Sequence, residues 1–72
     1  MDLTFDSHAM DRMSQRGVTS DDVEWAIRRQ IREDAGEPGT IWIVGYAAGR
    51  RILKVCVRTD DKTYVITVAW EE

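Results

Sequence analysis

The 72-residue chain contains one cysteine, one histidine and one proline. With Cys56 alone, no disulfide can form within the chain, and with His8 alone there is no Cys/His cluster for a structural zinc ion. No stretch approaches the roughly 20 apolar residues of a membrane span. The lone thiol and the lack of an apolar leader after Met1 favour a cytoplasmic location. The sequence thus predicts no metal, no cofactor and no membrane partner.

The composition is that of a folded domain, because 43% of the residues are hydrophobic and a single proline is present. Residues 1–72 contain no repeat, linker or low-complexity segment, so we expect one small domain. A chain this short buries only about 60% of its unfolded surface, so its stability is expected to be marginal.

The charges are unevenly distributed. Thirteen acids against ten bases give a net charge of −3, which argues against a non-specific nucleic-acid binder. Eight of the ten bases are arginine, the side chain best shaped to bind phosphate or carboxylate. Residues 50–58 carry four bases and no acid, and two further basic groups lie at Arg12/Arg16 and at Arg28/Arg29/Arg32. An acidic protein with one basic face is therefore expected.

Two helices are predicted in the first half of the chain. Residues 7–16 form the first, with Asp6 or Ser7 as the N-cap and Gly17 in the left-handed position after its end. The second follows a capping box at residues 19–22. Its apolar stripe has the spacing of a buried helix face and comprises Val23, Ala26, Ile27 and Ile31.

The second half of the chain has strand character. Residues 33–39 are predicted to be a loop, and three runs rich in β-branched and aromatic residues follow at 41–47, 51–59 and 63–70. Short turns between the runs indicate an antiparallel meander. Residues 3–5 fit a short edge strand. The prediction is an α+β fold, with two N-terminal helices on one face of a three- to four-stranded antiparallel sheet.

Alternation along each strand predicts which residues face the helices. In the middle run, Leu53, Val55 and Val57 should meet the helices. The first run is apolar on both sides, so it is predicted to be central. The last run should place four residues on one side, namely Tyr64, Ile66, Val68 and Trp70. The face free of helices would then carry cations, hydroxyls and some aromatic surface.

The opening of the chain carries a recognisable pattern, with Ser7-His8-Ala9, Arg12-Met13 and Arg16-Gly17-Val18 in succession. It resembles the small bacterial proteins of domain-of-unknown-function family 4258, and residues 65–68 resemble the closing segment of that family. The resemblance implies a relation to RelE-like ribonuclease toxins, with two helices laid on a small antiparallel sheet. Trp25 departs from the pattern, because the family normally has a polar residue there.

One edge of the first helix offers the groups that metal-independent RNA cleavage requires. His8, Arg12 and Arg16 are spaced i, i+4 and i+8, so a neutral imidazole would be the base and two guanidinium groups would hold phosphate. These three are the candidate catalytic residues. Four residues of the sheet are candidates for RNA binding, namely Tyr46, Arg51, Lys54 and Arg58.

Each of these residues also has a purely structural interpretation. His8 can extend the helix cap, and Arg12 and Arg16 can pair with nearby carboxylates. The basic strand can be an ordinary solvated face, and Cys56 a small packed residue rather than a reactive thiol. Trp25 either packs across the first helix or the N-terminal segment, or contacts a partner.

Two functions are therefore carried forward. The first is a RelE-like toxin-type module that binds RNA and cleaves it without a metal. The second is a non-catalytic protein-binding module, such as a toxin neutraliser, an inhibitor or an obligate dimer. Net acidity, Trp25 and edge strands with little charge favour the second function. The first requires the guanidinium groups of the opening helix and of the middle strand to share one hollow.

Overall fold

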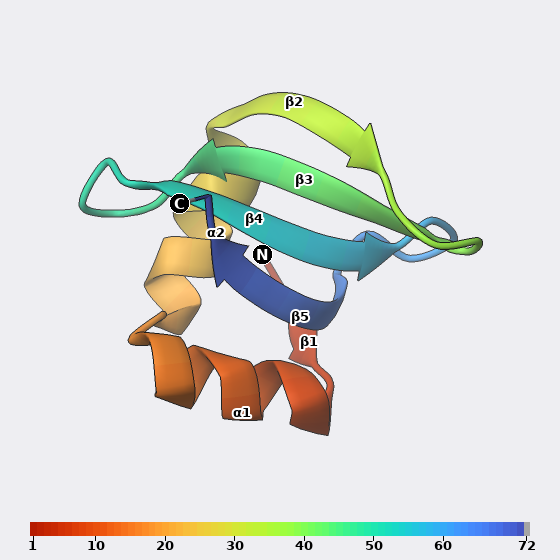
Figure 1. The fold of residues 1–72 in the computed structure, drawn as a ribbon, viewed down its shortest axis with the longest axis horizontal. Coiled ribbons are helices and arrows are strands. Elements are labelled where there is room, and N and C mark those ends of the chain that lie inside the picture. The colour runs from red at the N-terminus through yellow and green to blue at the C-terminus, as the bar shows by residue number, and fades with distance from the viewer. Residues whose placement is uncertain (72) are drawn as a thin grey trace.

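The computed structural model describes residues 1–71, so Glu72 lies outside the described part of the chain. Figure 1 shows two helices packed on one side of a curved sheet. In chain order the elements are β1 (Thr4–Phe5), α1 (Ser7–Arg16), α2 (Ser20–Arg28), β2 (Gln30–Ala35), β3 (Thr40–Tyr46), β4 (Ile52–Arg58) and β5 (Tyr64–Trp70). Within residues 1–71, no helix has the length and apolar character needed to cross a membrane.

The predicted α+β class is confirmed, but the predicted sheet is wrong in two respects. The sheet has five strands in the order β1-β5-β4-β3-β2, not three or four. It is mixed, because β1 pairs with β5 in parallel while all other neighbours are antiparallel. The parallel pair arises because the chain passes through both helices and the meander before it returns beside its own beginning. The short segment at residues 3–5 is an edge strand, as expected.

The prediction of a loop over residues 33–39 is wrong at its start. β2 runs to Ala35 as the edge strand beside β3, although it contains Arg32, Glu33 and Asp34. Charged residues have low strand propensity, and here pairing with an apolar neighbour outweighs that propensity. The prediction that Ile31 belongs to the buried stripe of the second helix is also wrong. α2 ends at Arg28, and Ile31 lies at a register shift in β2 with 47% of its surface exposed.

The helix boundaries follow the local signals that predicted them. At the start of α1, the Asp6 carboxylate accepts from the backbone N–H of His8 at 3.0 Å. At its end, Gly17 has φ 66°, in the left-handed region. At the start of α2, Thr19 and Asp22 form the predicted capping box, with reciprocal hydrogen bonds of 3.0 Å.

Thr19→Ala is expected to lower the free energy of unfolding by about 1 kcal/mol, because it removes one of the two hydrogen bonds of the capping box. Urea unfolding followed by circular dichroism measures the change. Ser14→Ala, at an exposed site within α1, is the control and should change stability by less than about 0.5 kcal/mol. Equal stability of the two variants would contradict a stabilising cap at Thr19.

The core lies between the sheet and the helices. Leu53, Val55 and Val57 of β4 are completely buried on the helix side, as predicted. α1 packs along β5, and α2 packs across β3 and β4. β3 has neighbours on both sides, as its apolar faces indicate, but β4 is the middle strand of the five. The helices thus leave the opposite face of the sheet open.

Alternation fails in β5. The register shifts between Cys56 and Val57, which pair with Thr67 and Val65, so Ile66 is an extra residue at a β-bulge. The bulge places both Val65 and Val68 in the core, three residues apart. The prediction that Tyr64, Ile66, Val68 and Trp70 share one face is therefore wrong, because an inserted residue reverses the alternation along the strand.

Candidate nucleic-acid interface

The basic side chains fall into two groups according to their partners. Arg28, Arg32, Arg58 and Lys62 each form a salt bridge with a carboxylate. Within residues 1–71 the remaining six form none, and they are Arg12, Arg16, Arg29, Arg50, Arg51 and Lys54. Exposed ion pairs stabilise a fold little, so the pairing matters mainly because it shows where positive charge is left uncompensated.

The uncompensated charge gathers at one end of the sheet. The β2–β3 and β4–β5 connections lie together at the opposite end, where Thr59 N–H donates to the carbonyl of Gly39 at 3.0 Å. These two connections and their flanks carry most of the sheet's acids, namely Glu33, Asp34, Glu37, Asp60 and Asp61. The β3–β4 connection, residues 47–51, carries Arg50 and Arg51 and no acid. A protein of net negative charge therefore has a cationic end.

The β3–β4 connection is a tight turn with an unusual residue in it. Arg50 N–H donates to the carbonyl of Ala47 at 2.9 Å, and Ala47 N–H donates to the carbonyl of Arg51 at 2.8 Å. Arg50 has φ 69°, the only positive φ of a non-glycine residue in the described chain. Glycine or asparagine usually occupies that position of a three-residue hairpin loop, and another residue costs about 1 kcal/mol.

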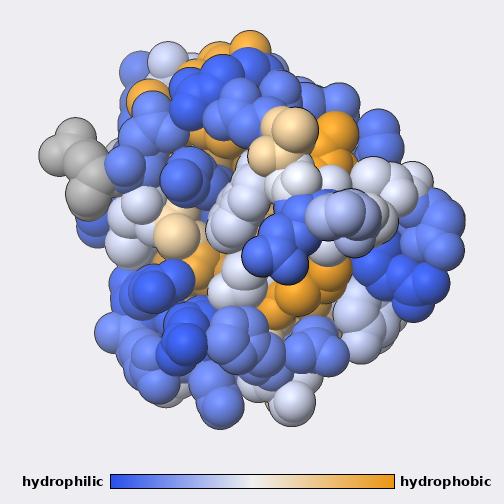
Figure 2. Space-filling model, turned by 45° about the vertical axis from the view of Figure 1, so that its right-hand side comes forward, coloured by the Kyte–Doolittle hydropathy of each residue, from blue (hydrophilic) through white to orange (hydrophobic). Residues whose placement is uncertain are grey.

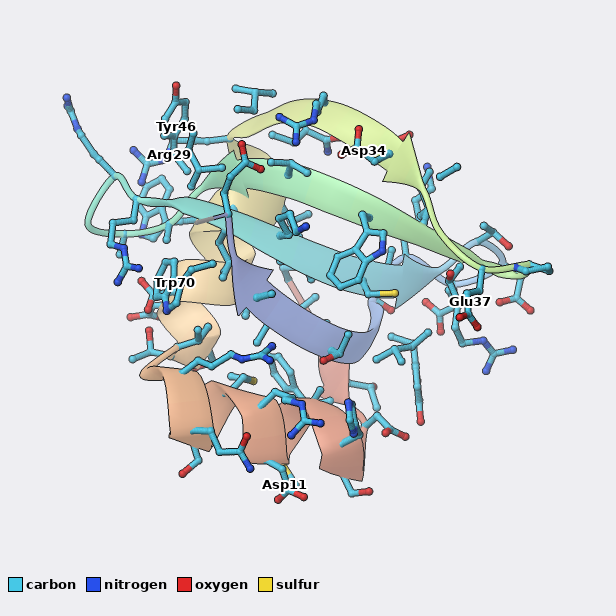
Figure 3. All side chains as sticks on the ribbon, viewed as in Figure 1. Asp11, Arg29, Asp34, Glu37, Tyr46 and Trp70 are labelled. Carbon is cyan, nitrogen blue, oxygen red and sulfur yellow. The ribbon has the colours of Figure 1, made fainter. Side chains whose placement is uncertain are left out.

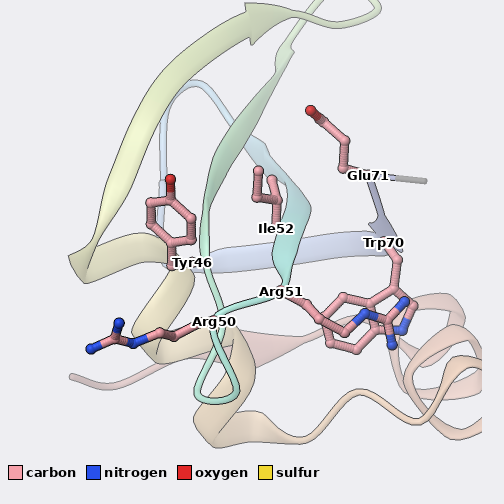
Figure 4. Close-up of a pocket in the computed structure, with 6 residues that line it drawn as sticks. All are labelled: Tyr46, Arg50, Arg51, Ile52, Trp70 and Glu71. Atoms are coloured by element: carbon pink, nitrogen blue, oxygen red, sulfur yellow. The ribbon is translucent and has the colours of Figure 1, made fainter.

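A groove opens beside this turn at the end of the sheet, and we call it the Tyr46–Trp70 groove (Figure 4). It has a volume of about 500 Å³ and is lined by Tyr46, Arg50, Arg51, Ile52, Trp70 and Glu71. Figure 4 shows Ile52 between Tyr46 on one side and Trp70 with Arg51 on the other. Two guanidinium groups and two aromatic rings thus line one hollow, the combination with which proteins bind single-stranded nucleic acid, and the Glu71 carboxylate in the same lining is paired with Arg32 at 3.0 Å.

Trp70 connects this groove to helix α1. Its Nε1–H donates to the carbonyl of Arg16 at 2.7 Å, which satisfies a carbonyl left open at the end of the helix. The guanidinium of Arg51 lies over the indole, 4.0 Å from its centre. Arg16 itself donates from Nη1 to the carbonyl of Val68 at 2.6 Å. Trp70 therefore links the end of α1, through the backbone of Arg16, to the turn that carries Arg51, while the Arg16 guanidinium binds the backbone of β5.

Arg29 adds a third guanidinium on the helix side of the turn. It caps α2, lies 4.2 Å from the centre of the Trp25 ring, and donates from Nη2 to the carbonyl of Ala47 at 3.0 Å. Figure 3 shows Arg29 beside Tyr46 at the end of the sheet. Asp22 also contacts this turn, and both of its carboxylate oxygens accept backbone N–H groups, those of Ala48 and Thr19.

The candidate catalytic residues are spread along α1. His8 lies in the first turn with an exposed side chain, and Arg16 lies about 12 Å farther along the helix axis, at its last residue. Arg12 donates to the side chain of Gln15 at 3.0 Å. The Tyr46–Trp70 groove is lined by other residues. None of the three lines the groove, and only Arg16 is connected to it, through the hydrogen bond that its backbone carbonyl accepts from Trp70.

The candidate RNA-binding residues divide between the two ends of β4. Tyr46 and Arg51 line the groove. Lys54 lies one pleat beyond Ile52 on the open face, 5.3 Å from the centre of the Trp42 ring. Arg58 lies at the other end, where Asp60 binds it at 2.9 Å. Sequence reasoning did not select Trp70 or Arg29, because only the pairing of β5 with β4 and the packing of α2 against β3 bring them to the turn.

Cys56 is a packed residue. It is 6% exposed, and burial raises the pKa of its thiol because the thiolate would lose its hydration. A raised pKa disfavours the reactive thiolate, in line with the structural interpretation of this residue. Within residues 1–71, no three His, Cys, Asp or Glu side chains are grouped to hold a metal ion.

Tyr64 connects the start of α1 with the far end of β4. Its hydroxyl donates to Asp6 Oδ1 at 3.0 Å, and Arg58 lies 5.5 Å from the centre of its ring. The hydrogen bond to Asp6 raises the pKa of Tyr64, and the charge of the same carboxylate adds to the effect because it would repel a phenolate.

This raised pKa predicts a loss of stability at alkaline pH. Below the ordinary tyrosine pKa of about 10, both folded and unfolded chains keep the proton and the contribution is complete. Above it the unfolded chain releases the proton first, so the free energy of unfolding falls until the folded-state pKa is passed. Unfolding in urea between pH 9 and 11 should show a steeper fall for the wild type than for Tyr64→Phe. Parallel profiles would contradict the role of Asp6.

Trp25 remains 44% exposed, so packing against helix α1 or the N-terminal segment does not bury it. One side of its ring is covered by Arg29, and the indole lines a hollow of about 250 Å³ together with Asp21, Glu24 and Arg28. The α-amino group of Met1 lies 3.7 Å from Glu24. The side chain is thus available to a partner, as the contact hypothesis requires.

Fold and site together define a small α+β protein, with two helices on a mixed sheet and a cationic, aromatic groove at one sheet end. The chain belongs to the family described as domain of unknown function (DUF4258), whose model matches residues 5–70. Neither the curated proteins nor the solved structures contain a match to the chain.

Proposed function

We propose that this protein is a cytoplasmic, RelE-like module of the toxin type, and that it binds single-stranded RNA in the Tyr46–Trp70 groove. The observation that supports this most is that Arg50 and Arg51 line the groove, Arg51 over the Trp70 ring, and that neither has a carboxylate partner in residues 1–71. Phosphate oxygens would accept hydrogen bonds from these guanidinium groups and balance their charge. Tyr46 is 39% exposed, so a base can stack on its ring.

Equilibrium binding of a fluorescent single-stranded RNA tests the proposal. The logarithm of the affinity should fall linearly with the logarithm of salt concentration, by about 0.7 for each phosphate neutralised. Arg51→Gln should weaken binding about tenfold, whereas Arg58→Gln, which removes a cation already paired with Asp60, should leave the affinity within about twofold. Binding that is absent, independent of salt or equally sensitive to both substitutions would refute the proposal.

Cleavage without a metal is the second part of the proposal. A strand that leaves the groove past Arg16 would run along α1 to Arg12 and reach the exposed imidazole of His8 as a base. Growth arrest on induced expression is the expected result for the wild type. A variant with both His8→Ala and Arg12→Ala should relieve the arrest yet still bind RNA. If the wild type neither arrests growth nor cleaves RNA in a translation extract, the enzymatic part fails.

A protein-binding function is the alternative, and the exposed Trp25 favours it. The sheet edges favour it less than expected, because edge strand β2 carries Arg32, Glu33 and Asp34 and a register shift, features that discourage strand addition. On the face seen in Figure 2, hydrophobic residues lie in small separate areas among hydrophilic ones. Light scattering at micromolar concentration measures the molar mass in solution. The mass of a monomer would exclude an obligate dimer.

A further inference from the structure

We propose that RNA occupies both sides of the β3–β4 turn, with one phosphate in the Tyr46–Trp70 groove and the next in a second hollow on the other side. The second hollow, here called the Arg29 hollow, has a volume of about 460 Å³ and is lined by Arg29, Tyr46 and Arg50. This inference rests on the proposed function and specifies its ligand, an unpaired strand that presents at least two consecutive phosphates.

The two hollows share a wall. Tyr46 and Arg50 line both of them, whereas Arg51 lines only the groove and Arg29 only the second hollow. Figure 4 shows that Arg50 and Arg51 point to opposite sides of the turn. One strand could therefore cross the turn over the Tyr46 ring and meet a guanidinium group on each side.

Arg29 is well prepared for such a role. Its guanidinium is held by the Trp25 ring and by the carbonyl of Ala47, so little side-chain freedom is left to lose on binding. Only one of its five N–H groups has a partner within residues 1–71, and its Nε is buried with none. An enclosed donor without a partner costs roughly 1–3 kcal/mol. The fold thus holds the Arg29 guanidinium at the hollow but leaves most of its N–H groups without a hydrogen-bond acceptor.

The backbone of the turn is a second, independent indication. Arg50 occupies the left-handed position, φ 69°, while its neighbour Gly49 lies outside the positive-φ region. Glycine adopts a positive φ without strain, yet the glycine of this turn, Gly49, is one position before the residue that has it. Backbone strain of this kind is found where a side chain is needed at a fixed place. Arg50 is the cation common to both hollows, so strain and ligand contact coincide at this residue.

A single small anion would use only one of the hollows. Arg29, Arg50 and Arg51 have no carboxylate partner in residues 1–71, and they are distributed over two hollows separated by an aromatic ring. Two successive phosphates could each meet a guanidinium group, one in each hollow, while the base between them stacks on the Tyr46 ring. The ligand class is therefore an oligonucleotide rather than a mononucleotide.

Fluorescence anisotropy with oligouridylates of two, four and eight nucleotides, and with uridine 5′-monophosphate as a competitor, tests the inference. The tetranucleotide should bind the wild type at least tenfold more tightly than the monophosphate. Arg29→Gln should weaken tetranucleotide binding about tenfold and reduce the salt slope by about 0.7, the value for one phosphate contact. Arg28→Gln is the matched control, because Arg28 is adjacent, exposed and paired with Glu24 at 2.9 Å.

Arg50→Gly provides a test that does not depend on loss of structure. Glycine relieves the left-handed backbone, so the urea midpoint of unfolding should rise while the affinity for the tetranucleotide falls. Arg29→Lys keeps the charge and should retain the salt slope, which separates a lost phosphate contact from a disturbed fold.

The outcomes distinguish the inference from the function on which it rests. If no oligonucleotide binds the wild type, the proposed function fails. If the wild type binds and Arg51→Gln weakens binding, but Arg29→Gln behaves as Arg28→Gln does, RNA uses the groove alone and the inference is overturned. A monophosphate that binds as tightly as the tetranucleotide overturns it as well. Weakening by Arg29→Gln and by Arg50→Gly, with the latter variant more stable, supports it.

Discussion

Gly45→Ala is expected to leave the chain largely unfolded. Gly45 lies in β3 where α2 crosses the sheet, and a Cβ there would collide with the carbonyl oxygen of Ala26 and lie 2.8 Å from that of Arg29. Both obstacles are backbone atoms of the helix end, so neither can turn aside as a side chain would. Overpacking of a core usually costs about 1–3 kcal/mol, and a backbone collision should exceed that range in a domain of marginal stability.

Circular dichroism and urea unfolding measure this effect. Gly49→Ala is the matched control, because a Cβ at Gly49 meets nothing within 4 Å and its φ lies outside the positive region. The control should change stability by less than about 0.5 kcal/mol. A folded Gly45→Ala protein with nearly wild-type stability would show that α2 does not lie this close to β3.

Trp70→Ala should cause the second largest loss, of about 3 kcal/mol. The substitution removes a large ring that packs against the core, the 2.7 Å hydrogen bond to the carbonyl of Arg16, and the surface on which Arg51 lies. Trp70→Phe keeps the ring packing and loses the hydrogen bond, so it should cost only about 1 kcal/mol.

The exposed Trp25 provides the comparison for Trp70. Trp25→Ala removes a ring of the same size that is 44% exposed, and it should cost less than about 1 kcal/mol in urea unfolding. The Trp70→Ala protein should also bind RNA more weakly, measured at a temperature at which it is folded. If Trp25→Ala and Trp70→Ala destabilise the protein equally, Trp70 is not the link between α1, β5 and Arg51 that the structure indicates.

Local signals predicted the elements that depend on local chemistry. The caps at Asp6, Gly17 and Thr19 are formed by residues within three positions of the helix ends, so the sequence contained all of their chemistry. Alternation predicted the buried side of β4 for the same reason. β2 was missed because its stability comes from pairing with β3. The faces of β5 were mispredicted before Ile66, because a bulge there cannot be seen without the partner strand.

The candidate site was predicted only in part for a similar reason. Tyr46 directly precedes the short turn that Arg51 ends, so their proximity follows from the sequence. Trp70 joins them because Leu53 pairs with it, across a sheet whose register was unknown. Arg58 lies on the same strand as Arg51, but pairing with Asp60 and its place at the opposite end separate it from the groove. The basic run at residues 50–58 is therefore divided between two ends of the sheet, with uncompensated charge at Arg51 and compensated charge at Arg58.

Mapping of RNA contacts by nuclear magnetic resonance tests the central claim most directly, because the chain is only 8.3 kDa. A single-stranded oligouridylate would be titrated into the ¹⁵N-labelled protein and amide shifts followed. We expect the largest changes at residues 45–52, at Arg29 and at residues 70–71, with little change around Arg58 and the β2–β3 connection. Changes centred on Arg58, or none at any residue, would contradict an RNA site at the β3–β4 turn.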